Sequence, residues 1–573
     1  MIYRPEHPKP QFRRENWENL NGEWEFEQDL SNSGEARGLF LPEARFGEKI
    51  MLPFCPQSRL SGIGNKDFLA SVWYRRRVTL SEKELSGRAV LHIGACDYQT
   101  TLYVNGQKVG THRGGYLSFS FDITSFVKAG ENQIVIHAED DERDPLIPSG
   151  KQSDRFDSYS CFYTRTTGIW QTVWLEFTPK SYLAGLRLFP SPENASVTLI
   201  AELVGAGELR AEAFFEGKPM GLASAKTNGG QLTLVIPLAE AHLWELGVGN
   251  LYDLSLTFGE DHVDSYFGLR SIAFHDKKFY LNGKSVFQRL ILDQGFYPDG
   301  IYTAPSDEAL AADIDRALSM GFNGARLHQK IFEERFLYHA DRKGYLVWAE
   351  YPSWGLDHSR FESLFAILPE WLGEIGRDFN HPSIVCWCPF NETWGVNGRP
   401  QRPEVIESIY RVTKAADPTR PCVEVSGNYH LSGVGDFYDV HDYNQNPAEF
   451  ASHFAGLSEK GTYFEENIGC RGCQSYDNVR PFCISEYGGI RWSDDRAGWG
   501  YGEGPQTKEE FMARFRGLTD AILDNPAVFG FCYTQLTDVE QEQNGLYTYD
   551  RKEKFPPSEI APIVRRKAAV EEE

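Results

Sequence analysis

Two glutamates in this 573-residue chain each close an apolar run. Glu392 ends the run in CPFNETWG (388–395), and Glu486 ends the run in CISEYGGI (483–490). The surroundings of a carboxylate at the tip of a buried strand can keep it protonated or keep it ionised. Two such groups in one pocket can divide acid, base and nucleophilic roles between them. The first question is therefore whether the fold brings the two glutamates together.

The second half of the chain has a pattern that would do so. Apolar strand-like runs alternate there with amphipathic helical patterns, and Ser306 fits a helix N-cap while Gly344 fits a helix end. The strand candidates are 286–293, 323–328, 345–351, 384–392, 422–427, 437–443, 482–488 and 528–536. Eight strand–helix units predict a (β/α)8 barrel. The rival, an open doubly wound sheet, is disfavoured because no glycine-rich phosphate loop follows the first strand.

The barrel prediction places both glutamates at one site. Active sites of such barrels are built at the carboxyl ends of the strands. Glu392 ends the fourth predicted strand and Glu486 ends the seventh, so both carboxylates should point into the same mouth. A carboxylate pair in an aromatic-rich pocket favours glycoside hydrolysis, and aromatic residues make up 14% of the chain.

The first half of the chain reads as all-β. Short alternating runs separated by turn residues fill residues 1–180, and about seven further short strands in 181–273 suit a small sandwich. We therefore expect three domains, with the catalytic barrel in residues 274–573.

The composition of the chain excludes some classes of binding partner. The net charge of −23 argues against nucleic acid and against an anionic membrane surface as a partner. No signal-peptide core and no apolar run of membrane-spanning length is found, so we expect no membrane contact. Cysteines within apolar runs, such as Cys386 and Cys532, fit a reducing cytoplasm. We read the lone CxxC of Cys470 and Cys473 as two loop thiols, and we expect no metal and no cofactor.

Several segments resemble glycoside hydrolase family 2. FNHPSIVCWCPFNETWG (379–395) resembles the acid/base signature of that family, and ISEYGG (484–489) resembles its nucleophile strand. LYVNGQKVGTHRGGYLSFSFDIT (102–124) and TTGIWQTVWLE (166–176) resemble its jelly-roll domain. The resemblance implies a jelly-roll β-sandwich in 1–180, an immunoglobulin-like β-sandwich in 181–273, and then a TIM barrel.

The resemblance also assigns roles. It implies that Glu392 is the general acid/base and Glu486 the nucleophile of a retaining enzyme. Asn391 would hold the 2-hydroxyl of the sugar, and Tyr443 would donate a hydrogen bond to the nucleophile. Arg326 would lie near the nucleophile and keep it ionised, as a neighbouring guanidinium does.

The sugar itself is harder to predict. Where the family reads Arg-x-Ser-His, this chain reads Arg326-Leu327-His328-Gln329, so the usual glycone histidine is shifted or replaced. We assign further candidate substrate-binding residues from positions at or near strand ends. They are Asp293, Gln294, His328, Trp348, His441 and Tyr533.

The uronate signature of the family is missing. Its β-glucuronidases carry Asn-x-Lys before the last Gly-x-x-x-x-Asp-Arg stretch, and this chain has Glu542-Gln543-Asn544 there. Lys330 or Arg491 could supply a cation instead. We expect a retaining exo-glycosidase of β-galactosidase type that acts on terminal non-reducing β-glycosides. The alternatives are a β-glucuronidase or galacturonidase, a β-mannosidase, and an arabino- or galactofuranosidase. A non-catalytic carbohydrate-binding protein is a remote alternative.

Two matters stay open at this stage. The acidic segment 139–154 is either a solvated loop or a divalent-cation site, and a further possibility is that it leans over the barrel mouth and narrows it. The predicted partner is a carbohydrate substrate, and the sequence neither requires nor excludes a homo-oligomer.

Overall fold

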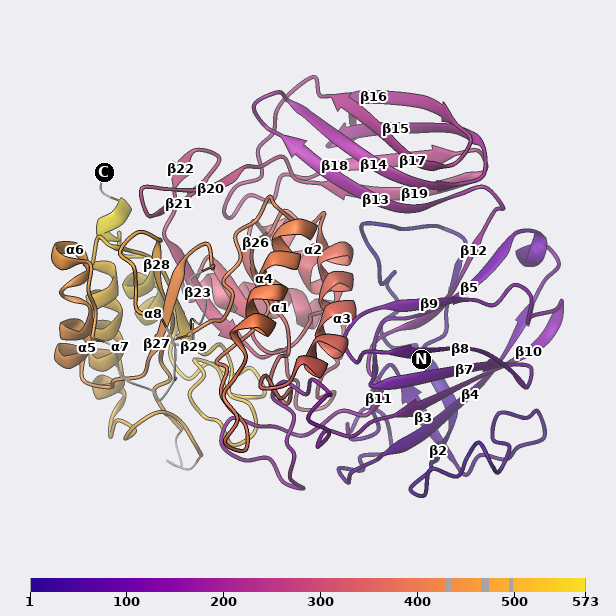
Figure 1. Ribbon diagram of the computed structural model, residues 1–573, viewed down its shortest axis with the longest axis horizontal. Coiled ribbons are helices and arrows are strands. Elements are labelled where there is room, and N and C mark those ends of the chain that lie inside the picture. The colour runs from indigo at the N-terminus through magenta and orange to yellow at the C-terminus, as the bar shows by residue number, and fades with distance from the viewer. Residues whose placement is uncertain (1, 428–429, 431–433, 465–473, 494–497, 572–573) are drawn as a thin grey trace.

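The computed structural model describes residues 2–427, 430, 434–464, 474–493 and 498–571. Figure 1 shows an indigo-to-purple sandwich around the N-terminus, a magenta sandwich beside it, and a third body in which helices surround parallel strands. The fold class predicted from the sequence is confirmed. The exact domain boundaries stay a prediction.

The first sandwich packs two sheets, whose strand orders are β1-β12-β5-β9 and β3-β2-β4-β10-β7-β8. The two-stranded pair β11-β6 lies beside them. The strands are β1 (Trp17–Asn19), β2 (Gly22–Gln28), β3 (Glu48–Leu52), β4 (Ser71–Leu80), β5 (Arg88–Ile93), β6 (Cys96–Asp97), β7 (Gln99–Val104), β8 (Gln107–Arg113), β9 (Phe119–Asp122), β10 (Gly130–Glu139), β11 (Gly168–Ile169) and β12 (Val173–Thr178). Buried residues of the two facing sheets, such as Trp24 and Ile136, form its core.

The second sandwich also has two antiparallel sheets, in the orders β13-β14-β17 and β16-β15-β18-β19. Its strands are β13 (Tyr182–Ser191), β14 (Ser196–Val204), β15 (Gly207–Phe215), β16 (Lys218–Thr227), β17 (Gly230–Pro237), β18 (Tyr252–Phe258) and β19 (Asp261–Phe267). Every second side chain of β18 is buried, which is the period expected for a strand with one face on a core.

The barrel sheet is parallel and has the order β26-β25-β24-β23-β29-β28-β27. Its strands are β23 (Gln288–Asp293), β24 (Gly324–Leu327), β25 (Leu346–Glu350), β26 (Ile384–Cys388), β27 (Tyr438–Asp442), β28 (Phe482–Gly488) and β29 (Val528–Thr534). The small sheet β20 (Ile272–His275), β21 (Lys278–Leu281) and β22 (Lys284–Ser285) precedes it.

The fifth predicted strand, 422–427, is not a regular strand. On one side it forms isolated bridges with the β26 segment, where the Ser426 amide donates to the Phe390 carbonyl at 2.8 Å. On the other side the carboxylate of Asp439 accepts from Ser426 Oγ at 2.6 Å and from the Gly427 amide at 3.2 Å. Because these side-chain bonds stand where ladder bonds would be, the segment fills the gap between β26 and β27 without regular pairing.

Helices surround the strands (Figure 1). They are α1 (Asp307–Ser319), α2 (Glu334–Lys343), α3 (Leu364–Asp378), α4 (Pro403–Ala416), α5 (Pro447–Phe454), α6 (Leu457–Lys460), α7 (Lys508–Leu523) and α8 (Pro557–Val564). The predicted cap of α1 is confirmed, because the Ser306 side chain accepts from the Ala309 amide. Gly344 ends α2 in the left-handed conformation that glycine favours, with φ of 63°.

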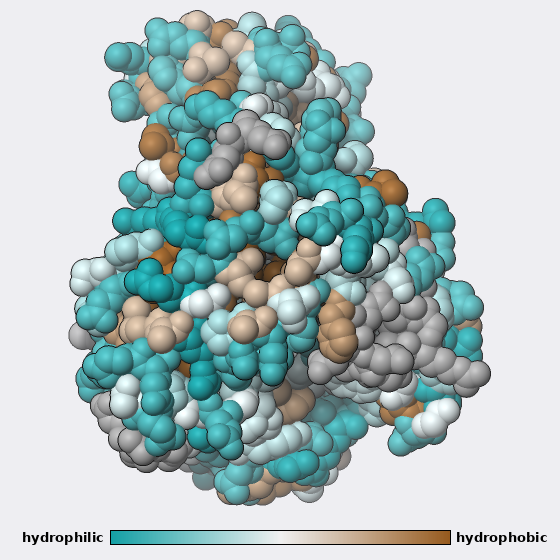
Figure 2. All heavy atoms as spheres, turned by 90° about the vertical axis from the view of Figure 1, so that its left-hand side faces the viewer, coloured by the Kyte–Doolittle hydropathy of each residue, from teal (hydrophilic) through white to brown (hydrophobic). Residues whose placement is uncertain are grey.

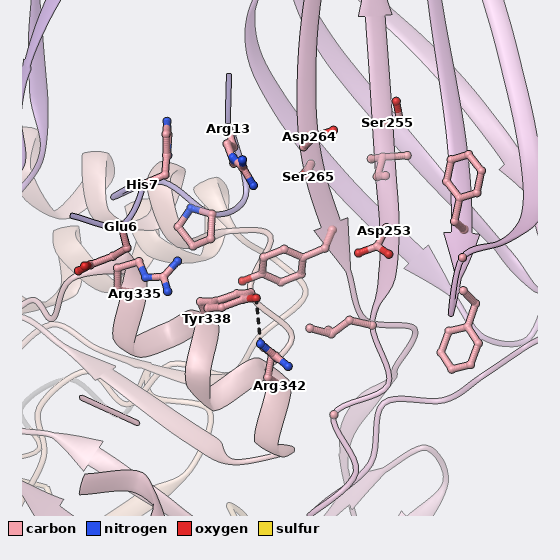
Figure 3. A pocket seen from close by; sticks show the side chains of 18 of the residues that line it. Glu6, His7, Arg13, Asp253, Ser255, Asp264, Ser265, Arg335, Tyr338 and Arg342 are labelled. Atoms are coloured by element: carbon pink, nitrogen blue, oxygen red, sulfur yellow. Dashed lines mark hydrogen bonds between the residues drawn. The ribbon is translucent and has the colours of Figure 1, made fainter. Parts of the chain in front are cut away.

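A groove of about 1120 Å³ lies where the N-terminal segment, the second sandwich and α2 meet. Figure 3 shows Arg335, Tyr338 and Arg342 of α2 facing Asp253 of β18 across it. This groove contains none of the candidate site residues. On the face drawn in Figure 2, hydrophilic residues predominate and hydrophobic ones occur in small groups. Among the described residues, no helix combines the length and the apolar character needed to cross a membrane.

Candidate active site

The structure brings Glu392 and Glu486 together with His441. Glu486 lies in β28, His441 in β27, and Glu392 four residues after the end of β26. One carboxylate oxygen of each glutamate and one ring nitrogen of His441 all lie within 4.8 Å of one another. The two carboxylates predicted to share a mouth therefore do so, and a histidine lies between them.

Glu486 is held ionised. Its side chain is buried, Oε1 accepts from Arg326 Nη1 at 2.8 Å, and Oε2 accepts from the hydroxyl of Tyr443. Burial alone would raise the pKa of this carboxyl. The positive charges of His441 and Arg326 outweigh burial and lower the pKa of Glu486 to about 2. A carboxylate in this state is suited to act as a nucleophile.

Arg326 organises the site. Its side chain is 0% exposed, so each of its donors must find a partner inside the protein. Nε donates to Glu350 at 2.6 Å, Nη1 to Glu486, and Nη2 to the Asn391 side-chain oxygen at 2.6 Å. The two carboxylates balance the buried guanidinium, and the third bond orients Asn391 beside Glu392. Arg326, Asn391 and Tyr443 thus lie where the sequence-based hypothesis put them.

Glu392 is the more open of the two glutamates. Its side chain is 24% exposed, and its Oε1 lies 2.5 Å from Nδ1 of His441. Burial alone would lower the pKa of His441, but Glu486 and Glu392 raise it. The two carboxylates therefore favour the imidazolium form, whose Nδ1–H donates to Glu392. This arrangement holds a proton beside Glu392, the carboxylate next to the opening.

The cluster of Glu392, His441 and Glu486 also has the ligand types of a metal site. A metal ion there would lie beside the buried guanidinium of Arg326, which already occupies Glu486 at 2.8 Å. A metal ion bound to the same carboxylate would be a like charge close to this guanidinium in a buried site, and the two would repel strongly, so the residues do not fit a metal ion. Cys470 and Cys473, which we read as loop thiols, lie outside the described residues.

A second polar group lies at the end of β29. Gln294 donates to Gln535 at 2.9 Å, and Gln535 donates to Asn544 at 2.7 Å. Asn544 in turn donates to Glu542 at 3.0 Å, and the hydroxyl of Tyr163 donates to the other oxygen of Glu542. Gln294 therefore belongs to a hydrogen-bonded chain that runs from β23 to Glu542.

His328 contacts the same network as Arg326. Its Nδ1 lies 3.0 Å from Glu350, and the side chain is buried. Burial lowers the pKa of His328, more than the carboxylate of Glu350 raises it. The neutral imidazole therefore lies next to the Arg326–Glu350 pair, and Arg326 in turn bonds Glu486.

Three predicted substrate-binding residues do not reach the mouth. Trp348 is fully buried within the barrel, where its indole donates to Gln288 at 2.8 Å. Tyr533 is fully buried in the layer between strands and helices, where its ring packs on Phe515. Asp293 accepts from the Gly295 amide, and burial and Asp313 of α1 raise its pKa to about 6. Its side chain points outward because the inward positions of β23 are Leu290 and Leu292.

The two cations suggested for a uronate both have backbone partners in the protein. Lys330 is buried and donates to the carbonyls of Gly295 and Tyr302 at 2.6 and 2.8 Å. Burial lowers its pKa to about 7. Arg491 donates to the Gly498 carbonyl. Lys330 thus has two of its three donors committed to backbone carbonyls.

A cation that the sequence did not reveal lies at the mouth instead. Lys151 belongs to segment 139–154 of the first sandwich, and its Nζ lies 4.0 Å from the ring centre of Trp354. The Trp354 indole donates to the Asn391 carbonyl at 2.9 Å, next to Glu392. The segment is not the solvated loop considered from the sequence, because Asp140 and Glu142 are buried in it. Lys151 escaped prediction because only packing between domains brings it here.

Comparisons with known proteins identify the family. The family model "Glycosyl hydrolases family 2, sugar binding domain" matches residues 64–176, and "Glycosyl hydrolases family 2, TIM barrel domain" matches residues 272–490. Together they match more than half of the chain. A β-glucuronidase of Paenibacillus borealis is 22% identical, with 96% of each chain covered. A β-galactosidase of Thermoanaerobacter pseudethanolicus is 27% identical, over 66% of this chain and 51% of its own.

Solved structures share the fold. A β-glucuronidase of Lactobacillus rhamnosus matches with a TM-score of 0.81 at 19% identity, covering 98% of this chain and 99% of its own. A Ruminococcus gnavus β-glucuronidase in complex with D-glucuronic acid matches with a TM-score of 0.80 at 17% identity, covering 98% and 100%. The chain spans about half the length of some of the curated relatives it matches. On the two family models and the paired glutamates, the chain belongs to glycoside hydrolase family 2.

Proposed function

We propose that this protein is a retaining exo-β-glycosidase in which Glu486 is the nucleophile and Glu392 the general acid/base. The observation that carries the proposal is the closeness of the two carboxylates, whose oxygens lie within 4.8 Å of His441 and of each other. Carboxyl groups about 5 to 5.5 Å apart are typical of retaining enzymes, whereas inverting enzymes leave room for a water between them.

The chemistry follows from the surroundings of each group. The ionised Glu486 attacks the anomeric carbon as the bond to the leaving oxygen breaks, and that oxygen takes a proton from Glu392. Water then attacks the glycosyl-enzyme ester while Glu392 accepts its proton. His441, at 2.5 Å from Glu392, holds a proton next to the group that gives and regains one. Asn391, fixed by Arg326, is suited to hold the 2-hydroxyl.

For the glycone, a neutral galactose-type sugar is the first candidate. It is supported by the absence of the Asn-x-Lys pair and by the presence of Glu542 in its place. A glucuronide is the second candidate, because many of the similar proteins are named β-glucuronidases. The structure weakens the repulsion argument against it, since Glu542 accepts two hydrogen bonds and lies near Lys151.

The exo mode is supported by segment 139–154, which covers part of the barrel mouth and would leave room for a chain end. Figure 1 shows a purple loop of the first sandwich reaching across to the barrel, and the Ser149 and Gly150 amides bond the Trp354 carbonyl there. The remote alternative of a non-catalytic carbohydrate-binding protein is disfavoured, because a lectin has no need of a buried ionised carboxylate at 2.8 Å from an arginine.

The test is a panel of nitrophenyl glycosides with one aglycone and varied glycones. It includes galactose, glucuronate, galacturonate, mannose, arabinose and xylose, with the pentoses in both ring forms. We expect release of nitrophenol from at least one β-glycoside, best from a neutral one, and none by Glu486→Ala. Release from no glycoside by the folded wild-type protein would refute the proposed function.

A further inference from the structure

Lys151 is a buried cation without a paired carboxylate. Its side chain belongs to the first sandwich, and the residue is only 4% exposed. Among the described residues, no carboxylate oxygen lies within the 4.0 Å of an ion pair with it. Its ammonium has three donors, and no described residue is seen to accept from them, so they are open to water or to a ligand. A side chain of this kind at the edge of an active site is suited to bind a ligand.

The loop that carries Lys151 is held in place. The Ser149 and Gly150 amides donate to the Trp354 carbonyl at 2.8 and 3.1 Å. Gly150 has a positive φ of 57°, and a Cβ on it would lie 2.4 Å from the Gln329 carbonyl oxygen. The backbone of Lys151 bonds to Tyr163, whose amide donates to the Lys151 carbonyl at 2.8 Å. The ammonium is therefore fixed against the barrel.

Three carboxylates of the barrel act on Lys151 through their charge. Burial alone would lower its pKa, but the Cys161 thiol and the carboxylates of Glu542, Glu486 and Glu392 raise it. Glu542 is buried as well, and each of its oxygens accepts one hydrogen bond from the protein, which leaves lone pairs for further donors. A strong donor and a strong acceptor thus flank the space next to the catalytic pair.

We propose that Lys151 is a glycone-binding residue that the first domain supplies to the barrel, and that with Glu542 it binds hydroxyl groups of a neutral sugar. The ammonium donates to one hydroxyl oxygen, and Glu542 accepts from another. This inference rests on the proposed function and adds a specificity-determining residue to it.

A neutral sugar fits this space better than a uronate. Donors of Arg326 are taken by Glu350, Glu486 and Asn391, so Lys151 is the cation we consider for an acidic group there. A uronate carboxylate there would add a further negative charge close to the ionised Glu486 and to the buried Glu542. Hydroxyl groups can use the donor and the acceptor together without adding charge.

The test compares wild type with Lys151→Met on the best neutral glycoside of the panel, on its monodeoxy analogues, and on the uronide of the same phenol. Methionine keeps the length of the side chain and removes its donors. Arg155→Met is the matched control, because it removes a positive charge just beyond the same loop where the side chain is 66% exposed. Thermal unfolding establishes that each variant is folded.

We expect Lys151→Met to lower kcat/KM on the neutral glycoside by about 10- to 100-fold, as for a lost bond from a charged donor. On the one deoxy analogue that lacks the bound hydroxyl, wild type and variant should agree within about threefold. Arg155→Met should behave as wild type. We expect the uronide to be at least about tenfold poorer than the neutral glycoside for wild type.

Each contrary outcome has a separate meaning. An active wild type with an equally active Lys151→Met would overturn this inference and leave the proposed function standing. Suppose that the wild type prefers the uronide and that Lys151→Met lowers kcat/KM on the uronide alone. This result would overturn the assignment to a neutral sugar. A loss of the same size on every deoxy analogue would mean that Lys151 only holds the loop. An inert wild type would overturn both proposals.

Discussion

Replacing His441 by glutamine tests the electrostatics that this structure assigns to the nucleophile. Glutamine is uncharged and keeps an N–H donor for Glu392, so the change removes mainly the positive charge. Three charged groups face His441, namely Glu392 after β26, Glu486 on β28 and Arg326 on β24, and the hydroxyl of Ser426 lies 3.2 Å from its Nε2. Of these, Glu486 should respond most clearly in the pH dependence of the reaction.

The magnitude follows from the distances. His441 Nε2 lies 3.4 Å from Glu486 Oε1. Two unit charges at this separation attract by about 5 kcal/mol at an effective dielectric constant of about 20. Because Arg326 remains and the site can relax, we expect about 2 kcal/mol of this to appear as a pKa change, or about 1.5 units. Losing a positive neighbour raises a carboxyl pKa, so Glu486 should move from about 2 to about 3.5.

The assay is kcat/KM between pH 3 and pH 8, whose acid limb reports the free enzyme's nucleophile. The ratio of His441→Gln to wild type should be constant above about pH 5 and fall as pH decreases toward 3. Circular dichroism at each pH separates this from unfolding. His137→Gln, a buried histidine of the first sandwich, is the control. A folded variant whose ratio to wild type does not change with pH would refute the reasoning.

Two further predictions test other contacts. Glu392→Ala should release an activated phenol in a burst and then stall, with azide restoring turnover, whereas Glu486→Ala should show no burst; identical kinetics would mean misassigned roles. Burial alone lowers the pKa of His430, but Glu424 and Asp439 raise it to about 10. The stability this contributes is complete below about pH 6.5 and lost toward pH 10. The unfolding temperature of His430→Gln should therefore approach that of wild type near pH 9.5. A difference in unfolding temperature that is as large near pH 9.5 as at pH 6.5 would contradict this.

The sequence predicted the barrel and the glutamate pair because both depend on local pattern. Apolar strands alternating with helices set the fold, and strand ends in a parallel barrel meet at one mouth. The predicted helix cap at Ser306 and the helix end at Gly344 were confirmed for the same reason. The segment 422–427 was wrong as a regular strand because Asp439 bonds it through a side chain.

Some predicted substrate-binding residues do not reach the mouth, because local pattern does not fix how deep a side chain lies in the barrel or which way it points. Trp348 is on the inward side of β25, but two residues before Glu350, and so lies one layer deeper. Asp293 is one residue beyond an inward position, which turns it outward. Lys151 could not be found from local pattern, because it comes from another domain nearly 180 residues before Arg326. Only tertiary packing places it near the glutamates.

The central claim is that Glu486 forms a covalent bond to the sugar while Glu392 handles the proton. The most direct measurement is a proton NMR time course of the hydrolysis of a good β-glycoside, which shows the anomer released first. The account predicts the β-anomer first, followed by slow mutarotation, because two displacements retain configuration. Initial release of the α-anomer would contradict the account, since a water would then have to fit between carboxylates whose oxygens lie within 4.8 Å.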